Sequence, residues 1–201
     1  MNYDPRIHHR CSIRLKNYDY SQPGAYFVTI CVHCRVCLFG EIINGKMQLN
    51  EVGQIVVECF KEIPQHFRNV EHDVFVVMPN HIHGILFITP ATHACRHAGP
   101  KTQLPIETSW ARHASPLHSA TPKLPPLGTI VGSFKSAVTR RVNLQHNLSG
   151  KCLWQRNYYE HVVRDEAELQ QLREYVVNNS LNGNWMDCIP TTLQNGRNRP
   201  M

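Results

Sequence analysis

A Pro79-Asn80 pair divides one apolar stretch of this chain into two short runs. Residues 74–78 read Val-Phe-Val-Val-Met, and residues 81–88 continue as His-Ile-His-Gly-Ile-Leu-Phe-Ile. Short apolar runs rich in β-branched and aromatic residues, bounded by a proline break, are typical of buried strands. The sequence therefore predicts two neighbouring strands, the second of which begins at His81.

Two further patterns indicate strands nearer the N-terminus. Residues 25–32 are rich in β-branched and aromatic side chains and follow Pro23-Gly24. Asn44-Gly45 lies between the segments 38–43 and 46–49, and this dipeptide is the strongest short-range signal for a hairpin.

Apolar residues recur at helical spacing in three segments. The first covers residues 51–67 and follows Asn50, which can cap it, and the second covers residues 127–144. The third follows Asp165, which resembles the cap of a capping box, and runs to about residue 181. Because these helices do not alternate regularly with the strands, we predict an α+β fold: an antiparallel sheet with helices packed on one face.

The length of 201 residues suits one domain, predicted over residues 1–201. Residues 90–125 are rich in Pro, Ala, Thr, Ser and His and poor in large aliphatic residues, which predicts a flexible insertion. A polar tail is expected after about residue 187.

The composition also limits where such a chain can work. No apolar run reaches the roughly 18 residues that a membrane helix needs, and the first residues lack the apolar core of a secretory signal. The 8 cysteines are therefore expected to be reduced thiols of a cytoplasmic protein that has no membrane partner.

The net charge of +6 is concentrated in one part of the chain. Residues 126–164 contain one acidic residue, Glu160, and six basic residues: Lys135, Arg140, Arg141, Lys151, Arg156 and Arg164. A positive field of this kind favours a polyanion, and nucleic acid is the foremost candidate. The predicted DNA contacts are Lys135, Arg140, Arg141 and Arg156. Trp154 is a candidate stacking surface for an unpaired base, and the alternative role, which the sequence favours, is a buried tryptophan of the core.

The His81-Ile82-His83 sequence is the sharpest chemical signal. Residues two apart on a strand face the same way, so both imidazoles project together while Ile82 enters the core. Two imidazoles are part of a divalent metal site, which needs at least a third protein ligand. Two exposed strand histidines without any ligand role would show the same pattern.

Tyr175 and Asn179 are four residues apart and share one face of the last predicted helix. The amide oxygen of Asn179 can bind a hard cation, and Tyr175 places a phenol beside it. The same spacing fits a tyrosine at the edge of the core and an asparagine at a fraying helix end.

Two other groups of residues compete for chemical roles. Cys31, Cys34 and Cys37 form a Cys-x-x-Cys-x-x-Cys sequence, but alternation along a strand cannot aim all three at one zinc or iron–sulfur centre. Tyr158 and Tyr159 lie beside basic residues, and we interpret them as packing or DNA-contact residues because neither shares a helical face with a metal ligand.

Five blocks along the chain together resemble the HUH single-tyrosine transposases, in particular the branch called REP-associated tyrosine transposases. Residues 78–84, Met-Pro-Asn-His-Ile-His-Gly, are similar to the His-hydrophobic-His motif of that family. The other similar blocks are residues 12–29, 132–136 (Gly-Ser-Phe-Lys-Ser), 154–161 (Trp-Gln-Arg-Asn-Tyr-Tyr-Glu-His) and 173–179. The resemblance covers nearly the whole chain except residues 90–125 and the tail after Trp185.

The resemblance implies a ferredoxin-like core similar to an RNA-recognition fold. By position, it implies that His81, His83 and Asn179 bind Mg²⁺ or Mn²⁺ and that Tyr175 is the nucleophile that attacks DNA. Ser180 follows Asn179 where the family often has proline. Asn182, one turn further on, is the substitute candidate for the third ligand.

The implied substrate is single-stranded DNA that contains a hairpin, cleaved and rejoined through a 5′-phosphotyrosine intermediate by a monomer or homodimer at the bacterial nucleoid. Two alternatives share parts of this pattern. One is a non-catalytic, domesticated nucleic-acid-binding module on the same fold. The other is a rolling-circle initiator or relaxase, which shares the histidine pair but usually carries a further large domain.

Overall fold

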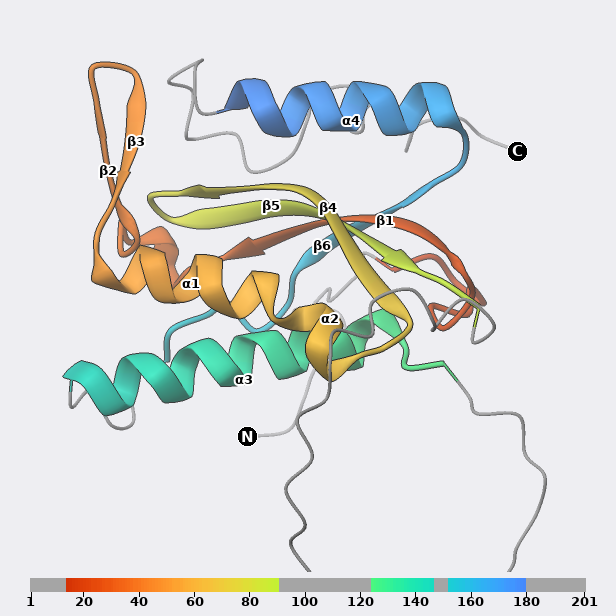
Figure 1. Cartoon of the computed structure of the whole chain (residues 1–201), viewed down its shortest axis with the longest axis horizontal. Helices are drawn as coiled ribbons and strands as arrows, with labels where there is room; N and C mark the ends of the chain where they lie inside the picture. The colour runs from red at the N-terminus through yellow and green to blue at the C-terminus, as the bar shows by residue number, and fades with distance from the viewer. Residues whose placement is uncertain (1–13, 91–123, 147–151, 180–201) are drawn as a thin grey trace, which may run out of the picture.

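A four-stranded antiparallel sheet forms the centre of the computed structural model, which describes residues 14–90, 124–146 and 152–179 (Figure 1). Its strands are β1 (Gly24–Cys31), β4 (Val70–Met78), β5 (His81–Ile88) and β6 (Tyr159–Val163), in the order β4-β5-β1-β6. The predicted insertion lies outside the described residues except at its two ends, and the predicted tail lies outside them altogether.

The remaining elements surround this sheet. They are the 3₁₀ helix η1 (His33–Arg35), the hairpin strands β2 (Gly40–Ile43) and β3 (Lys46–Leu49), and the helices α1 (Glu51–Lys61), α2 (Ile63–His66), α3 (Leu127–His146) and α4 (Glu166–Asn179). Among the described residues, no helix combines the length and the apolar character that crossing a membrane requires.

The central elements run β1-α1-β4-β5-α3-β6, which is the β-α-β-β-α-β order of a ferredoxin-like fold. Every neighbouring pair in the sheet is antiparallel, and residues 24–31 of β1 pair with residues 81–88 of β5 in unbroken register. The predicted α+β class with an antiparallel sheet is therefore confirmed.

The helices cover both faces of the sheet, whereas the sequence led us to expect one. Helices α1 and α3 pack on one face, and α4 lies alone across the other (Figure 1). The first face carries the larger apolar cluster, which includes Tyr26, Val28 and Ile30 of β1. On the second face, Phe27 of β1 packs with apolar residues of α4. A strand buried on both sides shows a continuous apolar run, so the sequence of β1 does not reveal which helix covers which face.

Local sequence explains where several elements begin and end. Asn50 caps α1, because its Oδ1 accepts a hydrogen bond from the Gly53 amide at 2.9 Å. The helix predicted over residues 51–67 instead ends at Lys61, and the short α2 follows with Pro64 in its first turn. Proline cannot donate the helical hydrogen bond and clashes with the preceding turn, so it starts a new helix instead of continuing the old one. The predicted hairpin is confirmed, with positive φ angles at Asn44 and Gly45.

Candidate active site

The two histidines of the predicted motif occupy the start of β5 on the face covered by α4. Ile82 points the other way, into the cluster beneath α1 and α3, as alternation along a strand requires. Both imidazoles are fully buried, with 0% of their surface exposed. The predicted common orientation is therefore confirmed, and the alternative of two exposed strand histidines is wrong.

The four ring nitrogens of the pair each have a close neighbour. Nε2 of His81 lies 3.0 Å from Nε2 of His83. On the outer side of each ring, Nδ1 of His81 lies 2.6 Å from Oδ1 of Asn80, and Nδ1 of His83 lies 2.8 Å from Oγ1 of Thr29. Because an amide oxygen can only accept, His81 donates through Nδ1, which leaves a lone pair on its Nε2. Outer partners of this kind orient the histidines of metal sites.

Burial also fixes the charge of the pair. It lowers the pKa of His81 to about 4, with a smaller contribution from the positive charge of Arg35. Burial lowers the pKa of His83 well below its usual range, and the neighbouring His81 adds to this effect. Both rings are therefore neutral at neutral pH, and a neutral imidazole is the form that binds a metal ion.

Helix α4 brings Tyr175 to the histidines. The phenolic oxygen lies 3.4 Å from Nε2 of His83, and the Tyr175 ring packs edge-on against the rings of both His83 and Phe27. Helix α4 begins after Asp165, whose Oδ1 accepts a hydrogen bond from the amide of Glu168 at 2.8 Å. Leu169, Leu172 and Val176 form its apolar stripe on the sheet.

Asn179 lies one turn beyond Tyr175 on the same helix and is buried, with 9% of its surface exposed. Its side-chain nitrogen Nδ2 is enclosed and has no hydrogen-bond partner. Rotating the amide by about half a turn would present its oxygen at that position instead. Within the described ranges, no three side chains of His, Cys, Asp or Glu are placed to hold a metal ion together. Among the described residues, the amide of Asn179 and the phenol of Tyr175 are the candidate oxygen ligands that α4 offers to His81 and His83.

The substitute ligand Asn182 lies outside the described residues. The cysteine triplet lies near the turn between β4 and β5, where Asn80 Nδ2 donates to the Arg35 carbonyl oxygen at 3.3 Å. Cys34 and Cys37 are exposed and Cys31 is half-buried.

The predicted DNA contacts lie on the other side of the sheet. Lys135, Arg140 and Arg141 belong to α3, which packs with α1, and hydrogen bonds with Lys135 hold the segment 154–157 against α3. Two of the five remain exposed there, Arg140 and Arg156. Arg141 instead forms ion pairs with Glu62 and Glu58 of the α1 region. Its charge is therefore already partnered within the protein.

Lys135 and Trp154 are also engaged internally. The Lys135 ammonium donates to the carbonyl oxygens of Gln155 and Asn157, at 2.9 and 3.2 Å, and burial lowers its pKa to about 8. The Trp154 indole is buried beside Phe39, and its Nε1 donates to the Lys135 carbonyl oxygen. Its ring faces are not open to an unpaired base, so the structure gives Trp154 a packing role.

Sequence reasoning overlooked two residues that position the pair. Asn80 links His81 to the carbonyl oxygen of Arg35 in η1, whereas the sequence identified Asn80 only as part of the break between two strands. Thr29 gave no signal, because its contact with His83 depends on the register between β1 and β5. Tyr159 also lies on the α4 side, directly across from Thr29 in β6, whereas Tyr158 packs on the opposite side.

The chain is similar in sequence to an uncharacterized protein of Haemophilus influenzae. The two chains are 42% identical over 179 residues, which covers 89% of this chain and 92% of the other. The chain belongs to the family of this Haemophilus protein. No model of a known protein family matches the chain.

Two solved structures are similar at much lower identity. One is a REP-associated tyrosine transposase bound to a REP hairpin, with 16% identity, a TM-score of 0.47, and coverage of 86% of this chain and 74% of the other. The second is a candidate transposase from Deinococcus radiodurans, with 18% identity, a TM-score of 0.42, and coverage of 82% of this chain and 95% of the other.

Proposed function

We propose that this protein is a metal-dependent tyrosine transposase that cleaves and rejoins single-stranded hairpin DNA. The observation that carries the proposal is the approach of the Tyr175 phenolic oxygen to within 3.4 Å of His83 Nε2, which itself lies 3.0 Å from His81 Nε2. A candidate nucleophile and two candidate metal ligands thus come together from segments far apart in the sequence. The motif resemblance assigns the same residues to the same roles.

The donor set fits Mg²⁺ or Mn²⁺ in several respects. Two neutral imidazoles direct their Nε2 atoms toward one another, and both have partners on Nδ1. Asn179 supports the fit because it is a buried amide with an enclosed, unpartnered nitrogen, one turn from Tyr175. When bound, the cation would draw charge from a phosphate oxygen of the substrate.

The chain's own residues would then carry out the transfer. Tyr175 forms a bond from its phenolic oxygen to the phosphorus, and the bond from phosphorus to the 3′-oxygen breaks. The phenolic proton passes to solvent water and the departing 3′-oxygen takes a proton from solvent water, which leaves a 5′-phosphotyrosine and a free 3′-hydroxyl. A 3′-hydroxyl can attack in reverse and rejoin the strands without a nucleotide cofactor. Thr29 and Asn80 hold the histidines in place during these steps.

Trapping the covalent intermediate tests this proposal. The protein is incubated with end-labelled hairpin DNA and Mn²⁺, with imperfect palindromes from the DNA beside its own gene included among the substrates, and an adduct that survives boiling in detergent is expected. Tyr175→Phe should abolish the adduct and keep hairpin binding, because only the nucleophilic oxygen is removed. Tyr158→Phe and Tyr159→Phe are the matched controls and should retain it. An adduct that persists in the Tyr175 variant would assign the nucleophile elsewhere.

A second candidate function is a non-catalytic DNA-binding module. The observation in its favour is that both histidines are fully buried, while the exposed basic residues Arg140 and Arg156 lie on the far side of the sheet. This function predicts hairpin binding without an adduct on any substrate. It also predicts that His81→Ala and Tyr175→Phe leave the affinity for DNA unchanged.

A further inference from the structure

Helix α4 meets the sheet through a narrow apolar stripe, so its rotation about its own axis needs another constraint. The stripe contains three buried side chains, those of Leu169, Leu172 and Val176. A helix turns by about 100° per residue, and residues two apart point in nearly opposite directions around it. Arg173 and Tyr175 therefore flank the stripe on its two sides. Any contact that holds Arg173 also determines where the phenol of Tyr175 lies.

The partner of Arg173 is supplied by an irregularity in β4. The register between β4 and β5 shifts between His72 and Phe75, as in a β-bulge. His72 and Phe75 both contact Phe60 on the α1 side of the sheet. Val74 packs in the cluster under α4, and the Asp73 carboxylate also reaches α4. In a regular strand, Asp73 and Val74 would point to opposite faces of the sheet. The bulge instead brings both side chains to the face that α4 covers.

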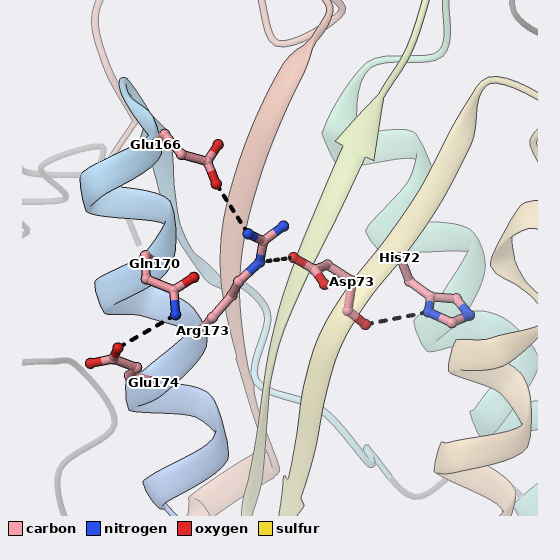
Figure 2. A network of polar contacts seen from close by, with 6 residues as sticks. All are labelled: His72, Asp73, Glu166, Gln170, Arg173 and Glu174. Carbon is pink, nitrogen blue, oxygen red and sulfur yellow. Dashed lines mark hydrogen bonds and ion pairs between the residues drawn. The ribbon is translucent and has the colours of Figure 1, made fainter.

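Figure 2 shows the contact that results. Nε of Arg173 donates to Oδ2 of Asp73 at 2.6 Å, and its terminal nitrogen donates to Glu166 Oε1 at 3.2 Å. The side chains of Arg173 and Asp73 are 31% and 22% exposed, so this pair is shielded from water far more than the outer Glu166, which is 79% exposed. The planar guanidinium fixes the direction of the hydrogen bond as well as its length.

A second polar contact fixes the beginning of α4. Nε2 of His161 in β6 lies 2.7 Å from Oε1 of Glu168, and the other oxygen of Glu168 accepts from the Arg164 amide. This contact lies on the β6 side, at the opposite edge of the sheet from Asp73 in β4. It anchors the first turn, but it lies almost two turns before Tyr175. The Asp73–Arg173 pair lies within one turn of Tyr175.

We infer that the Asp73–Arg173 ion pair sets the rotation of α4 and thereby holds the Tyr175 phenol at His83. Arg173 and Asp73 are positioning residues in this account, which rests on the proposed role of Tyr175 as the nucleophile. Loss of the pair leaves the apolar stripe in place but lets the helix roll, which moves the phenol away from the histidines. Because a small misplacement of a reacting group can cost about a hundredfold in rate, adduct formation should be far more sensitive than DNA binding.

The experiment compares two single variants with their charge-exchanged combination. Asp73→Ala and Arg173→Gln should each slow adduct formation at saturating hairpin by about tenfold to a hundredfold, with the Kd for the hairpin unchanged. Combining Asp73→Arg with Arg173→Asp should restore much of the rate, because the pair is rebuilt with its charges reversed. If the ion pair only stabilised the fold, its loss would not slow adduct formation while leaving the Kd for the hairpin unchanged.

Two controls separate positioning from stability. Gln170→Ala removes a hydrogen bond on the exposed side of the same helix, and Glu62→Gln weakens the Arg141 pair on the other side of the sheet. Both should keep the rate of adduct formation. If Glu62→Gln slows it as much as Asp73→Ala at equal loss of stability, the positioning role is overturned.

A readout independent of activity distinguishes failure of this inference from failure of the proposed function. The nuclear Overhauser effect between the Tyr175 and His83 rings should be present in the wild-type protein and weakened in Asp73→Ala. If the wild type forms no adduct but the ring contact weakens as expected, the proposed function fails and the positioning role stands. An unchanged ring contact in Asp73→Ala overturns the positioning role, whatever the activity.

Discussion

The phenolic oxygen of Tyr175 lies 3.4 Å from Nε2 of His83, although 92 residues separate the two along the chain. Helix α4 supplies the phenol and β5 supplies the imidazole. The sheet face that α4 covers is lined mainly by apolar side chains, and Thr29 on this face contacts Nδ1 of the His83 ring. This contact is the basis for the chemical predictions that follow.

Metal binding should depend on both histidines and on the groups that orient them. His81→Ala or His83→Ala should abolish binding of Mn²⁺, measured by titration calorimetry or by the electron paramagnetic resonance signal of free Mn²⁺. Thr29→Val removes the partner of His83 Nδ1 and should weaken binding about 10- to 100-fold. His33→Ala changes an exposed histidine nearby and should have no effect. Unaltered Mn²⁺ affinity in His81→Ala would place the metal elsewhere.

The two neighbouring arginines of α3 should behave differently. Arg140 is exposed, so Arg140→Glu should weaken binding to many DNA sequences alike. It should also reduce the slope of log Kd against log salt concentration by about the amount that one phosphate contact contributes. Arg141→Glu breaks the contacts with Glu62 and Glu58 and should mainly lower stability, by roughly 1 kcal/mol or more because like charges then face each other. Urea unfolding and DNA titrations at several salt concentrations measure the two effects. DNA affinity independent of salt would contradict the electrostatic account.

Stability should fall above about pH 10. Burial raises the pKa of Tyr20 to about 12, and it raises the pKa values of Tyr26 and Tyr158 from 10.0 as well. In the unfolded chain these phenols ionise near pH 10, so above that pH the folded protein keeps protons that the unfolded chain has lost. The stabilisation is complete below pH 10 and is lost as the pH rises through the folded-state pKa. Each such phenol contributes at most about 1.4 kcal/mol per pH unit.

Tyr158→Phe isolates one of these phenols. Urea unfolding at pH 9, 10 and 11 should show a shallower loss of stability in this variant than in the wild-type protein. Equal slopes for the two proteins would mean that the Tyr158 phenol ionises alike in the folded and unfolded states.

Gly84 should not tolerate a side chain. A methyl group at this position of β5 would lie 2.6 Å from Cζ of Phe60, so Gly84→Ala should destabilise the fold by about 1–3 kcal/mol. Gly132→Ala is the matched control, because nothing lies within 4 Å of the corresponding position on the exposed side of α3. This change should stabilise the helix by about 0.5–1 kcal/mol. Both values come from urea unfolding, and equal effects of the two substitutions would contradict the packing of Phe60 on β5.

Much of the fold follows from short-range signals. The caps Asn50 and Asp165, the Asn44-Gly45 turn and the Pro79-Asn80 break all lie where the sequence predicted them. These features depend on backbone preferences and on hydrogen bonds between residues a few positions apart, which a local sequence specifies. The predicted length of the first helix was wrong, because Pro64 starts a second short helix and α1 ends at Lys61.

The DNA contacts illustrate where the sequence was insufficient. The sequence predicted that the clustered basic residues form a surface that binds DNA. Whether each positive charge is available to DNA depends on the residues that surround it in the folded protein. Arg141 forms an ion pair with Glu62 across a helix interface, and Lys135 donates hydrogen bonds to two carbonyl oxygens of the segment after Trp154. Neither partnership leaves a periodic pattern in the chain.

By itself, the sequence determined that His81 and His83 share one face of a strand and that Tyr175 and Asn179 share one face of a helix, because both relationships follow from the period of a regular backbone. Only the tertiary structure decided that α4 covers the face that carries the histidines. The β1–β5 register placed Thr29 beside His83, and the β4 bulge turned Asp73 toward Arg173. These outcomes depend on how apolar faces from distant segments pack together, and such contacts exist only once the whole sheet has formed.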